Sequence, residues 1–441
     1  MHTSQTQSYK KDFPIFSTNS GLIYLDSGAS AQKPAMVIDG IKDFLSQTYA
    51  NIHRGSYDIS EQAEDLYYAS KVACAKLLNI SGDTSGNEII YTYNATYAYN
   101  LLAQSLWYSW VLQAGDVVLV DIAEHHANIV PWQMLSQRHG IIVERIDLDK
   151  NFQYNLEDFK KKYTDRVKVV SLSAASNVTG VLYNLRDIAS LLREDTFFVV
   201  DGSQAVPHVP IHMCFGESDL YWTHPAWSQD QSQTNLTSRI DALIFTGHKI
   251  MADTGLGVLY LAKKHIKSLT PARGGGGMIE DVNKESFKTA AGWQKFEAGT
   301  PHIVWAVSLL RAIEYLNSIW GYKTLIDHET KLITYALERI AKNPNLALLG
   351  MQDVDITITG WDNSQFTIPR LGIFSLTHKN LPNHIRLGET LAMQGICVRC
   401  GGHCTHPLFH TYEQNGSCRI SLYIYNDISD LEKTFDILDT L

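Results

Sequence analysis

The sequence predicts an α/β fold, with a large domain built on a mostly parallel, seven-stranded sheet and a smaller C-terminal α+β domain. Seven short apolar runs rich in β-branched and aromatic residues lie in the first 300 residues. Helix-like patterns separate several of them, at residues 96–112, 129–138 and 185–193. The last 140 residues do not continue this alternation of strands and helices. The seven runs are residues 88–92, 117–121, 141–146, 167–173, 197–201, 242–246 and 257–261.

The alternation of strands and helices indicates parallel pairing, with helices on both faces of the sheet. The helix at residues 129–138 is favoured by Pro131 in its first turn, where a missing N–H costs little. Sheets of this type bind ligands at the carboxyl ends of their strands. We therefore expect the functional residues just after the apolar runs.

The C-terminal part begins with helical patterns at residues 303–319 and 322–341. Shorter strands are predicted at 355–359, 371–376, 396–399 and 419–425, and an amphipathic helix at about 429–441. We place the domain boundary near Gly299-Thr300-Pro301. The predicted parts are residues 22–300, residues 301–441, and an arm at residues 1–21 that packs with the small domain.

Composition narrows the class of protein. The 441 residues are 45% hydrophobic with a net charge of −9, which excludes bulk disorder and argues against nucleic-acid binding. Six cysteines in a chain of this length indicate reduced thiols. No apolar run is long enough to span a membrane, and the N-terminus lacks a signal-peptide pattern. We expect a cytoplasmic enzyme, with the polar segment 217–238 as a surface excursion outside the site.

Two charged residues follow predicted strands. Asp201 ends the run Phe-Phe-Val-Val-Asp, and Lys249 follows Ala-Leu-Ile-Phe-Thr-Gly-His. A lysine opposite an acid at the carboxyl end of a sheet suits pyridoxal 5′-phosphate (PLP), because the lysine forms a Schiff base and the acid keeps the pyridine nitrogen protonated. The alternative is a lysine that extends from a strand end toward solvent beside an acidic neighbour.

Longer motifs resemble one family. The chain resembles Suf-type (group II) cysteine desulfurases, which include selenocysteine lyases, within the class V aminotransferase superfamily. The resemblance runs from about Tyr24 to Leu441. It is carried by Tyr24-Leu-Asp-Ser-Gly-Ala29, Asn51-Ile-His-Arg-Gly55, Glu124-His-His-Ala-Asn-Ile-Val-Pro-Trp132, Asn177-Val-Thr-Gly180, Asp201-Gly-Ser-Gln204, Thr246-Gly-His-Lys249, Gly274-Gly-Gly-Gly-Met-Ile279 and Lys295-Phe-Glu-Ala-Gly-Thr-Pro301.

The resemblance implies a PLP-dependent fold of type I and a role for each matching residue. Lys249 matches the Schiff-base lysine, Asp201 the pyridinium partner, and Gln204 the partner of the phenolic oxygen. His125 matches a catalytic residue stacked on the cofactor ring. Thr300 matches a phosphate contact supplied by the partner subunit of a homodimer. The other matches are phosphate binders Thr96, Thr246 and His248, and substrate-side residues Arg419, Asn177, Arg399 and His53.

Arg399-Cys-Gly-Gly-His-Cys404 resembles the loop that carries the catalytic cysteine, with Cys404 as the nucleophile. The implied reaction converts L-cysteine to L-alanine and leaves a persulfide on Cys404. A Suf-type acceptor protein then takes this sulfur for iron–sulfur cluster assembly. Neighbouring positive charge favours a thiolate, and Arg399 and His403 are the expected sources of that charge.

Three departures from the family pattern are visible: Gly402 replaces a common histidine, Cys400 lies four residues before Cys404, and Tyr97 replaces a usual glutamate. Other functions stay open. The cysteines and histidines from 397 to 410 have spacings compatible with zinc, although the predicted strand directs Cys397 and Cys400 to opposite faces, so we expect no metal. Further alternatives are a class V PLP enzyme acting on selenocysteine or cysteine sulfinate, and an ordinary aminotransferase. Another is a zinc-binding interaction module on a degenerate enzyme fold.

Overall fold

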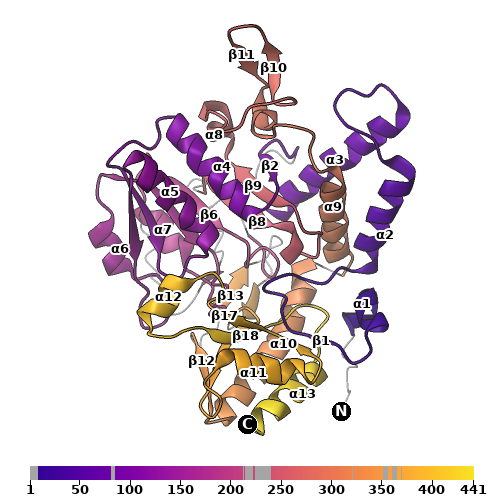
Figure 1. Cartoon of the computed structure of the whole chain (residues 1–441), viewed down its shortest axis with the longest axis vertical. Coiled ribbons are helices and arrows are strands. Elements are labelled where there is room, and N and C mark those ends of the chain that lie inside the picture. The colour runs from indigo at the N-terminus through magenta and orange to yellow at the C-terminus, as the bar shows by residue number, and fades with distance from the viewer. Residues whose placement is uncertain are drawn as a thin grey trace.

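The protein was analysed as a computed structural model, which describes residues 8–80, 85–211, 213, 222–223, 240–319, 321–350, 356–359, 365–368 and 370–441. Its largest sheet has seven strands in the order β2–β9–β8–β6–β5–β3–β4 (Figure 1). Only β9 runs against its neighbours within this sheet. This confirms the predicted mostly parallel sheet. Its strands are β2 (Ile89–Thr92), β3 (Val117–Asp121), β4 (Ile142–Ile146), β5 (Val167–Ser173), β6 (Phe197–Asp201), β8 (Ala242–Thr246) and β9 (Gly257–Leu261).

Helices cover this sheet and explain its continuous apolar runs. Every residue of β3, β6 and β8 is buried, as expected for parallel strands with both faces covered. Helix α4 packs on β8 and β9, and α5 and α6 pack on β4. The helices of this part are α2 (Ala35–Asp43), α3 (Asp58–Leu77), α4 (Ala95–Tyr108), α5 (Val130–His139), α6 (Leu156–Lys162), α7 (Leu185–Leu191), α8 (Lys263–Ser268) and α9 (Ile303–Ser318).

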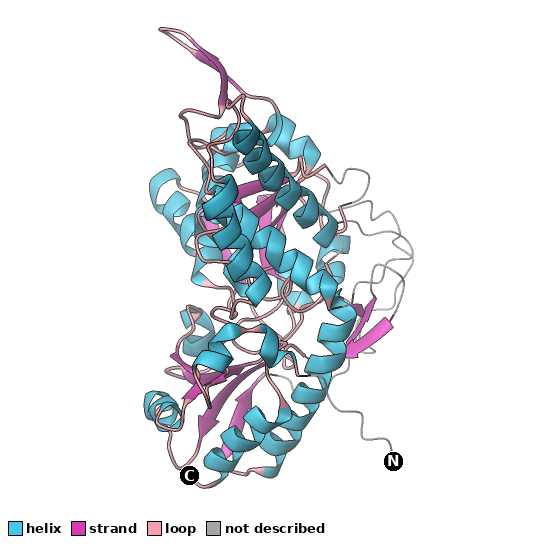
Figure 2. Cartoon of the chain, turned by 90° about the vertical axis from the view of Figure 1, so that its right-hand side faces the viewer, coloured by secondary structure: helices cyan, strands magenta, loops and turns pink. Residues whose placement is uncertain are grey.

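The C-terminal part contains an antiparallel sheet in the order β12–β15–β18–β17. Figure 2 shows these strands as the magenta group near the C-terminus. The strands of this sheet are β12 (Leu346–Leu349), β15 (Ile373–His378), β17 (Arg399–Gly401) and β18 (Ser417–Ser421). Helices α10 (Gly321–Lys342), α11 (His384–Ala392), α12 (His406–Thr411) and α13 (Ile428–Asp439) belong to this part. Smaller sheets are formed by β1 (Ile23–Tyr24) with β16 (Ile396–Cys397), by β10 (Ile279–Val282) with β11 (Phe287–Thr289), and by β14 (Gln365–Ile368), β13 (Ile356–Thr359) and β7 (Trp222–Thr223).

Two strand predictions in this part were wrong in detail. The single strand expected at 396–399 is two strands, because β16 pairs with β1 whereas β17 pairs with β18. The strand expected at 419–425 is β18, which ends at Ser421. Beyond it the chain turns, with the backbone N–H of Asn426 donating to the carbonyl of Tyr423. The apolar pattern extends over residues 422–425 because these residues are buried, although they are not part of the strand.

The N-terminal segment lies against the C-terminal part. Lys10 Nζ is 2.5 Å from Asp430 Oδ1 on α13, and Phe13, just before α1 (Pro14–Thr18), contacts Tyr315 and Tyr425 edge-on. The domain boundaries themselves stay a prediction. The segment 217–238 lies outside the described residues, apart from the backbone of β7, which pairs with β13. Among the described helices, none is long and apolar enough to cross a membrane.

Candidate active site

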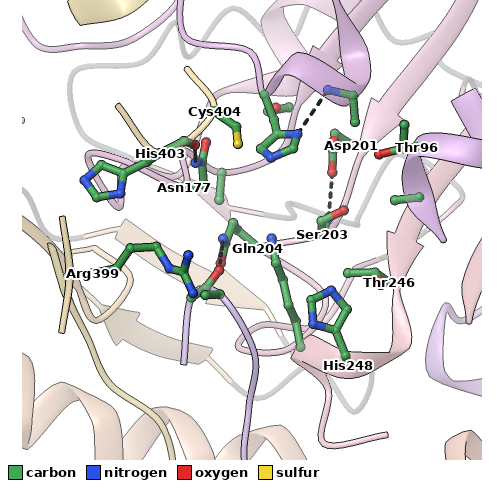
Figure 3. Close-up of a pocket in the computed structure, with 18 of the residues that line it drawn as sticks. Thr96, Asn177, Asp201, Ser203, Gln204, Thr246, His248, Arg399, His403 and Cys404 are labelled. Carbon is green, nitrogen blue, oxygen red and sulfur yellow. Dashed lines mark hydrogen bonds between the residues drawn. The ribbon is translucent and has the colours of Figure 1, made fainter. Parts of the chain in front are cut away.

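A cavity of about 460 Å³ opens where the carboxyl ends of β6 and β8 meet the β17–β18 strand pair. Its size is typical of a small-molecule site. Eleven of the thirteen predicted site residues line it, and Figure 3 shows several of their side chains converging. They are Thr96, His125, Asn177, Asp201, Gln204, Thr246, His248, Lys249, Arg399, Cys404 and Arg419.

Asp201 and Lys249 reach the cavity from neighbouring strands. Asp201 ends β6, and Lys249 ends a 3₁₀ turn that follows β8. The backbone N–H of Ser203 donates to Asp201 Oδ1 at 2.8 Å. Burial lowers the pKa of Lys249 to about 8, although Asp201 acts in the opposite direction. The neutral fraction of this lysine near neutral pH is therefore much larger than that of an ordinary lysine, and a neutral amine is the form that attacks carbonyl carbon.

His125 is held as a neutral imidazole. Burial, followed by the charge of Lys249, lowers its pKa to about 3. Its Nδ1 accepts a hydrogen bond from the backbone N–H of Ala127 at 3.1 Å, so Nε2 carries the proton of the neutral ring. The ring thus offers an uncharged face and one donor to the cavity.

Glu124 anchors the segment that carries His125, a role that the motif alone did not reveal. Glu124 is fully buried and accepts hydrogen bonds from the backbone N–H of Ser173 (2.6 Å), the Ser173 hydroxyl (2.7 Å) and Asn128 Nδ2 (2.7 Å). Burial and the nearby Asp121 raise the pKa of Glu124 well above its ordinary value. These bonds tie the end of β3 to the end of β5 directly below His125.

The end of the cavity formed by the first turn of α4 and the end of β8 is suited to a phosphate. The first turn of α4 lines it with Thr96, and Asn94 caps this helix by accepting from the backbone N–H of Tyr97 at 2.8 Å. Thr246 and His248 approach from the end of β8. The unpaired N–H groups and the dipole at a helix N-terminus favour anions. Burial lowers the pKa of His248 to about 4, so this histidine acts there as a neutral donor.

Four buried polar atoms of cavity residues have no hydrogen-bond partner in the part of the chain that the structure describes. They are Gln204 Oε1, His248 Nδ1, His403 Nδ1 and Arg419 Nε. The Gln204 amide is fixed on its other side, where Nε2 donates to the carbonyl of Gly28 at 2.8 Å. Buried polar groups are normally paired, so these atoms indicate where a polar ligand would bind.

Two arginines share one carboxylate at the small-domain side of the cavity. Arg399 donates to Asp26 from Nε (3.1 Å) and Nη2 (2.9 Å). Arg419 Nη2 is 3.5 Å from Asp26 Oδ1, and its Nη1 donates to the carbonyl of Asn177 at 2.8 Å. Burial lowers the pKa of Arg419 to about 10, which still leaves it charged at neutral pH. Asp26 belongs to the motif Tyr24–Ala29, whose sequence alone did not predict this role.

Cys404 lies in a loop that two large-domain segments hold. The backbone N–H of His126 donates to the Cys404 carbonyl at 2.8 Å, and Asn177 Nδ2 donates to the His403 carbonyl at 2.8 Å. His403 and Cys404 both have left-handed backbones, with φ of 46° and 56°. The Cys404 side chain is directed at the cavity from this turn (Figure 3).

One expectation about this loop was wrong. His403 does not supply positive charge, because burial lowers its pKa to about 3 and Nε2 lies 2.9 Å from the Ser417 hydroxyl. Arg399 is the charged neighbour that remains, although Asp26 partly neutralises it. The space next to Gly402 is filled by His406, since a Cβ at Gly402 would lie 2.5 Å from His406 Cδ2.

The cysteine loop does not assemble a metal site among the residues described. No group of three or more His, Cys, Asp or Glu side chains there is arranged to hold a metal ion. Cys397 belongs to β16, and Cys400 lies opposite Cys418 across β17 and β18. The sequence spacing that suggested zinc is thus divided between two sheets.

Thr300 and His53 lie outside the main cavity. Thr300 is exposed and lines a second cavity of about 60 Å³ with Tyr93 and Tyr97. His53 is also exposed, with Nδ1 3.3 Å from Glu64 Oε1 and its ring edge-on to Tyr67 at 6.2 Å. Tyr67 lines the same second cavity. In one copy of the chain, therefore, neither residue reaches Lys249.

This fold and site match a known family. The family model for class V aminotransferases matches residues 23–223 and 232–434, and the chain belongs to this family. Proteins named probable cysteine desulfurase, from Synechocystis and Vibrio cholerae, are 31% and 33% identical to the chain. These matches cover 97% and 93% of the chain, and 94% and 91% of the relatives. A protein named cysteine desulfurase from Salmonella agona is 33% identical over 98% of the chain and 97% of its own length.

Solved structures agree with these relatives. A cysteine desulfurase from Thermococcus onnurineus, in its apo form, superposes with a TM-score of 0.83 at 26% identity, covering 99% of this chain and 98% of that one. A cysteine desulfurase from Escherichia coli gives a TM-score of 0.80 at 28% identity, with 98% and 97% covered. The similarity therefore extends over both sheets and includes the cysteine loop.

Proposed function

We propose that the chain is a PLP-dependent cysteine desulfurase of the Suf type, which converts L-cysteine to L-alanine and leaves the sulfur as a persulfide on Cys404. The observation that carries this proposal is a single cavity lined by Lys249, Asp201 and Cys404. A transaminase needs the first two groups but has no use for a nucleophilic thiol. The similarity to proteins named cysteine desulfurase supports the same activity.

The cavity fits PLP. Asp201, Gln204 and the N-terminus of α4 provide an acid, an amide and an anion site, and Lys249 provides the amine. The unpartnered Gln204 Oε1 and His248 Nδ1 lie where the cofactor would give them polar neighbours. When bound, PLP withdraws electrons from the substrate Cα. Asp201 would hold the proton of the ring nitrogen, and His125 would cover the ring with a neutral face.

The substrate carboxylate is assigned to Arg419 and Asn177. Arg419 is 2% exposed and carries the unpartnered Nε, and its planar guanidinium binds a carboxylate through two parallel hydrogen bonds. Asn177 also holds the His403 carbonyl, so it links the substrate side of the cavity to the cysteine loop. This arrangement would keep the substrate sulfur on the side of Cys404.

Two residues would then move protons and sulfur. Lys249 is poised to take the Cα proton, because its lowered pKa allows a neutral amine near pH 8. Cys404 would attack the substrate sulfur as a thiolate, which breaks the carbon–sulfur bond. Arg399 is a charged group that lines the cavity beside the loop. His403, being neutral, would only shape the turn.

We further propose that the enzyme is a cytoplasmic homodimer that passes sulfur to a Suf-type acceptor protein for iron–sulfur cluster assembly. Thr300 and His53 lie near one exposed aromatic cavity rather than near Lys249. Their predicted roles would then require a second copy, whose Thr300 would reach the phosphate. The five described cysteines are free, as the chemistry of Cys404 requires.

The decisive experiment incubates purified holoenzyme with L-cysteine and measures alanine together with protein-bound persulfide. Equal amounts of both products in a single turnover, with the persulfide on Cys404, are expected. Lys249→Ala is the control and should form neither product. Alanine without persulfide, or pyruvate in place of alanine, would contradict the proposal. A parallel incubation with L-selenocysteine measures the preference for sulfur over selenium.

A further inference from the structure

Strands β17 and β18 place two cysteines directly opposite each other. Their antiparallel register pairs Arg399 with Arg419, and Cys400 with Cys418. Successive side chains on a strand point to opposite faces. Because both arginines face Asp26 at the cavity, the two cysteines face the other way, toward α11. A Cβ at Gly388 on α11 would collide with Cys400 Sγ, so the glycine makes room for this thiol.

This placement meets the geometric requirement for a disulfide. Directly opposed residues on antiparallel strands have Cα atoms about 4.5–5.5 Å apart, and disulfides join Cα atoms about 4.4–6.8 Å apart. Both cysteines are free in this structure. Neither strand has to shift its register for the two sulfur atoms to bond.

The two thiols differ in access and in acidity. Cys400 is partly exposed, whereas Cys418 is 1% exposed. The hydrogen bond between the two thiols lowers the pKa of Cys400 and raises that of Cys418. Peroxides react with exposed thiolates, so Cys400 would react first and Cys418 second.

We propose that Cys400 and Cys418 form a peroxide-reactive thiol pair, in which Cys418 is the resolving cysteine that keeps oxidation of Cys400 reversible. The Cys400 thiolate attacks one oxygen of hydrogen peroxide, which breaks the O–O bond and leaves a sulfenic acid and one water. Cys418 then attacks the Cys400 sulfur, which breaks the S–O bond and releases a second water. The two thiols lose two electrons, the peroxide gains them, and a cross-strand disulfide forms.

This pair is distinct from the proposed catalytic thiol, although Cys400 also lines the cavity that Cys404 enters. Cys404 lies beyond β17 in the loop held by the His126 N–H and Asn177, whereas Cys400 is on the strand and faces α11. The inference is therefore independent of the proposed desulfurase activity.

The test uses PLP-loaded Cys404→Ser protein, so that the catalytic thiol does not consume the oxidant. The protein is treated with increasing hydrogen peroxide, the remaining thiols are alkylated, and non-reducing digests are analysed by mass spectrometry. We expect a linked peptide pair that joins Cys400 to Cys418 and disappears after dithiothreitol. The absorption of bound PLP confirms that each sample is folded.

Two variants in the Cys404→Ser background separate the roles of the pair. With Cys418→Ala, Cys400 should convert to sulfinic acid, which dithiothreitol does not reverse. With Cys400→Ala, Cys418 should be recovered as an unoxidised thiol, because it is buried. A linkage of Cys400 to any other cysteine would overturn the proposal. So would full recovery of both thiols at a peroxide dose that oxidises Cys400 in the Cys418→Ala protein.

Discussion

Replacing Lys71 with methionine should strongly destabilise the protein, because Lys71 is a buried charge with a single buried counter-ion. Lys71 lies on α3, and its Nζ is 2.6 Å from Glu297 Oε1, with side chains 1% and 6% exposed. Nζ also donates to the carbonyl of Ile89 at 2.8 Å and lies 3.7 Å from the ring centre of Trp293. The pair thus ties α3 and β2 to the segment that leads to Thr300.

The magnitude follows from what remains after the change. Glu297 would keep its hydrogen bonds from the backbone N–H of Tyr91 and the hydroxyl of Tyr67 but would lose its cation. Removing one partner of a buried ion pair costs about 3–5 kcal/mol, since the other charge stays buried and uncompensated. At roughly 2 °C per kcal/mol for a large domain, the thermal midpoint should fall by roughly 6–10 °C.

The assay is thermal unfolding of the holoenzyme at fixed protein and PLP concentrations, because ligands and association shift the midpoint. Lys71→Met/Glu297→Gln should recover at least half of the loss, since glutamine carries no charge and still accepts from Tyr91. Lys160→Met is the surface control. It breaks the exposed pair with Glu157 and should leave the midpoint nearly unchanged. A shift below 2 °C in Lys71→Met, or no recovery in the double variant, would refute the reasoning.

Three further predictions concern the active site. Because burial lowers the pKa of Lys249 from 10.5 to about 8, the neutral amine increases as the pH rises through 8. PLP uptake by apoenzyme, followed by stopped-flow absorption, should therefore accelerate from pH 7 to 9, and a rate independent of pH would contradict this. Asp201→Ala should retain weak PLP binding and lose about 10²–10³-fold in kcat for alanine formation, whereas an unchanged kcat would reject its role. Cys404→Ala should bind PLP and L-cysteine without forming a persulfide, and Cys400→Ala should form persulfide at the normal rate. Mass spectrometry of the persulfidated protein identifies the cysteine that carries the sulfur. A persulfide on Cys400 would contradict the assignment of Cys404 as the nucleophile.

The pattern of apolar residues is sufficient to predict the large sheet. Its apolar runs at 117–121, 197–201 and 242–246 match the ends of β3, β6 and β8, because parallel strands with both faces covered must be apolar throughout. The same topology fixes where Asp201 and Lys249 emerge. Local pattern was therefore enough to place both residues at strand carboxyl ends but left a solvent-directed lysine as the alternative, and it was motif similarity that favoured a shared site and added the residues around them.

The local sequence pattern predicted strand bounds less reliably where strand pairing, rather than burial of side chains, determines where a strand begins and ends. The segment 396–399 satisfies a strand pattern, yet its two halves pair with two different strands, the first with the distant β1 and the second with the nearer β18. The segment 419–425 is buried beyond the end of β18 because the chain turns into the core. A periodic pattern of apolar residues indicates which side chains are buried, but it does not indicate which strand will pair with the segment.

The charge states and partners of the site residues depend on packing between distant segments, which the residue pattern does not reveal. His403 was expected to be a cation from its position beside Cys404, but burial makes it neutral. Asp26 links Arg399 and Arg419 from almost 400 residues away, and Cys418 lies opposite Cys400. Solvation and Coulomb energies depend on what surrounds a group in space. Those surroundings come from segments remote in the chain, so the sequence identified the reactive residues while packing set their chemistry.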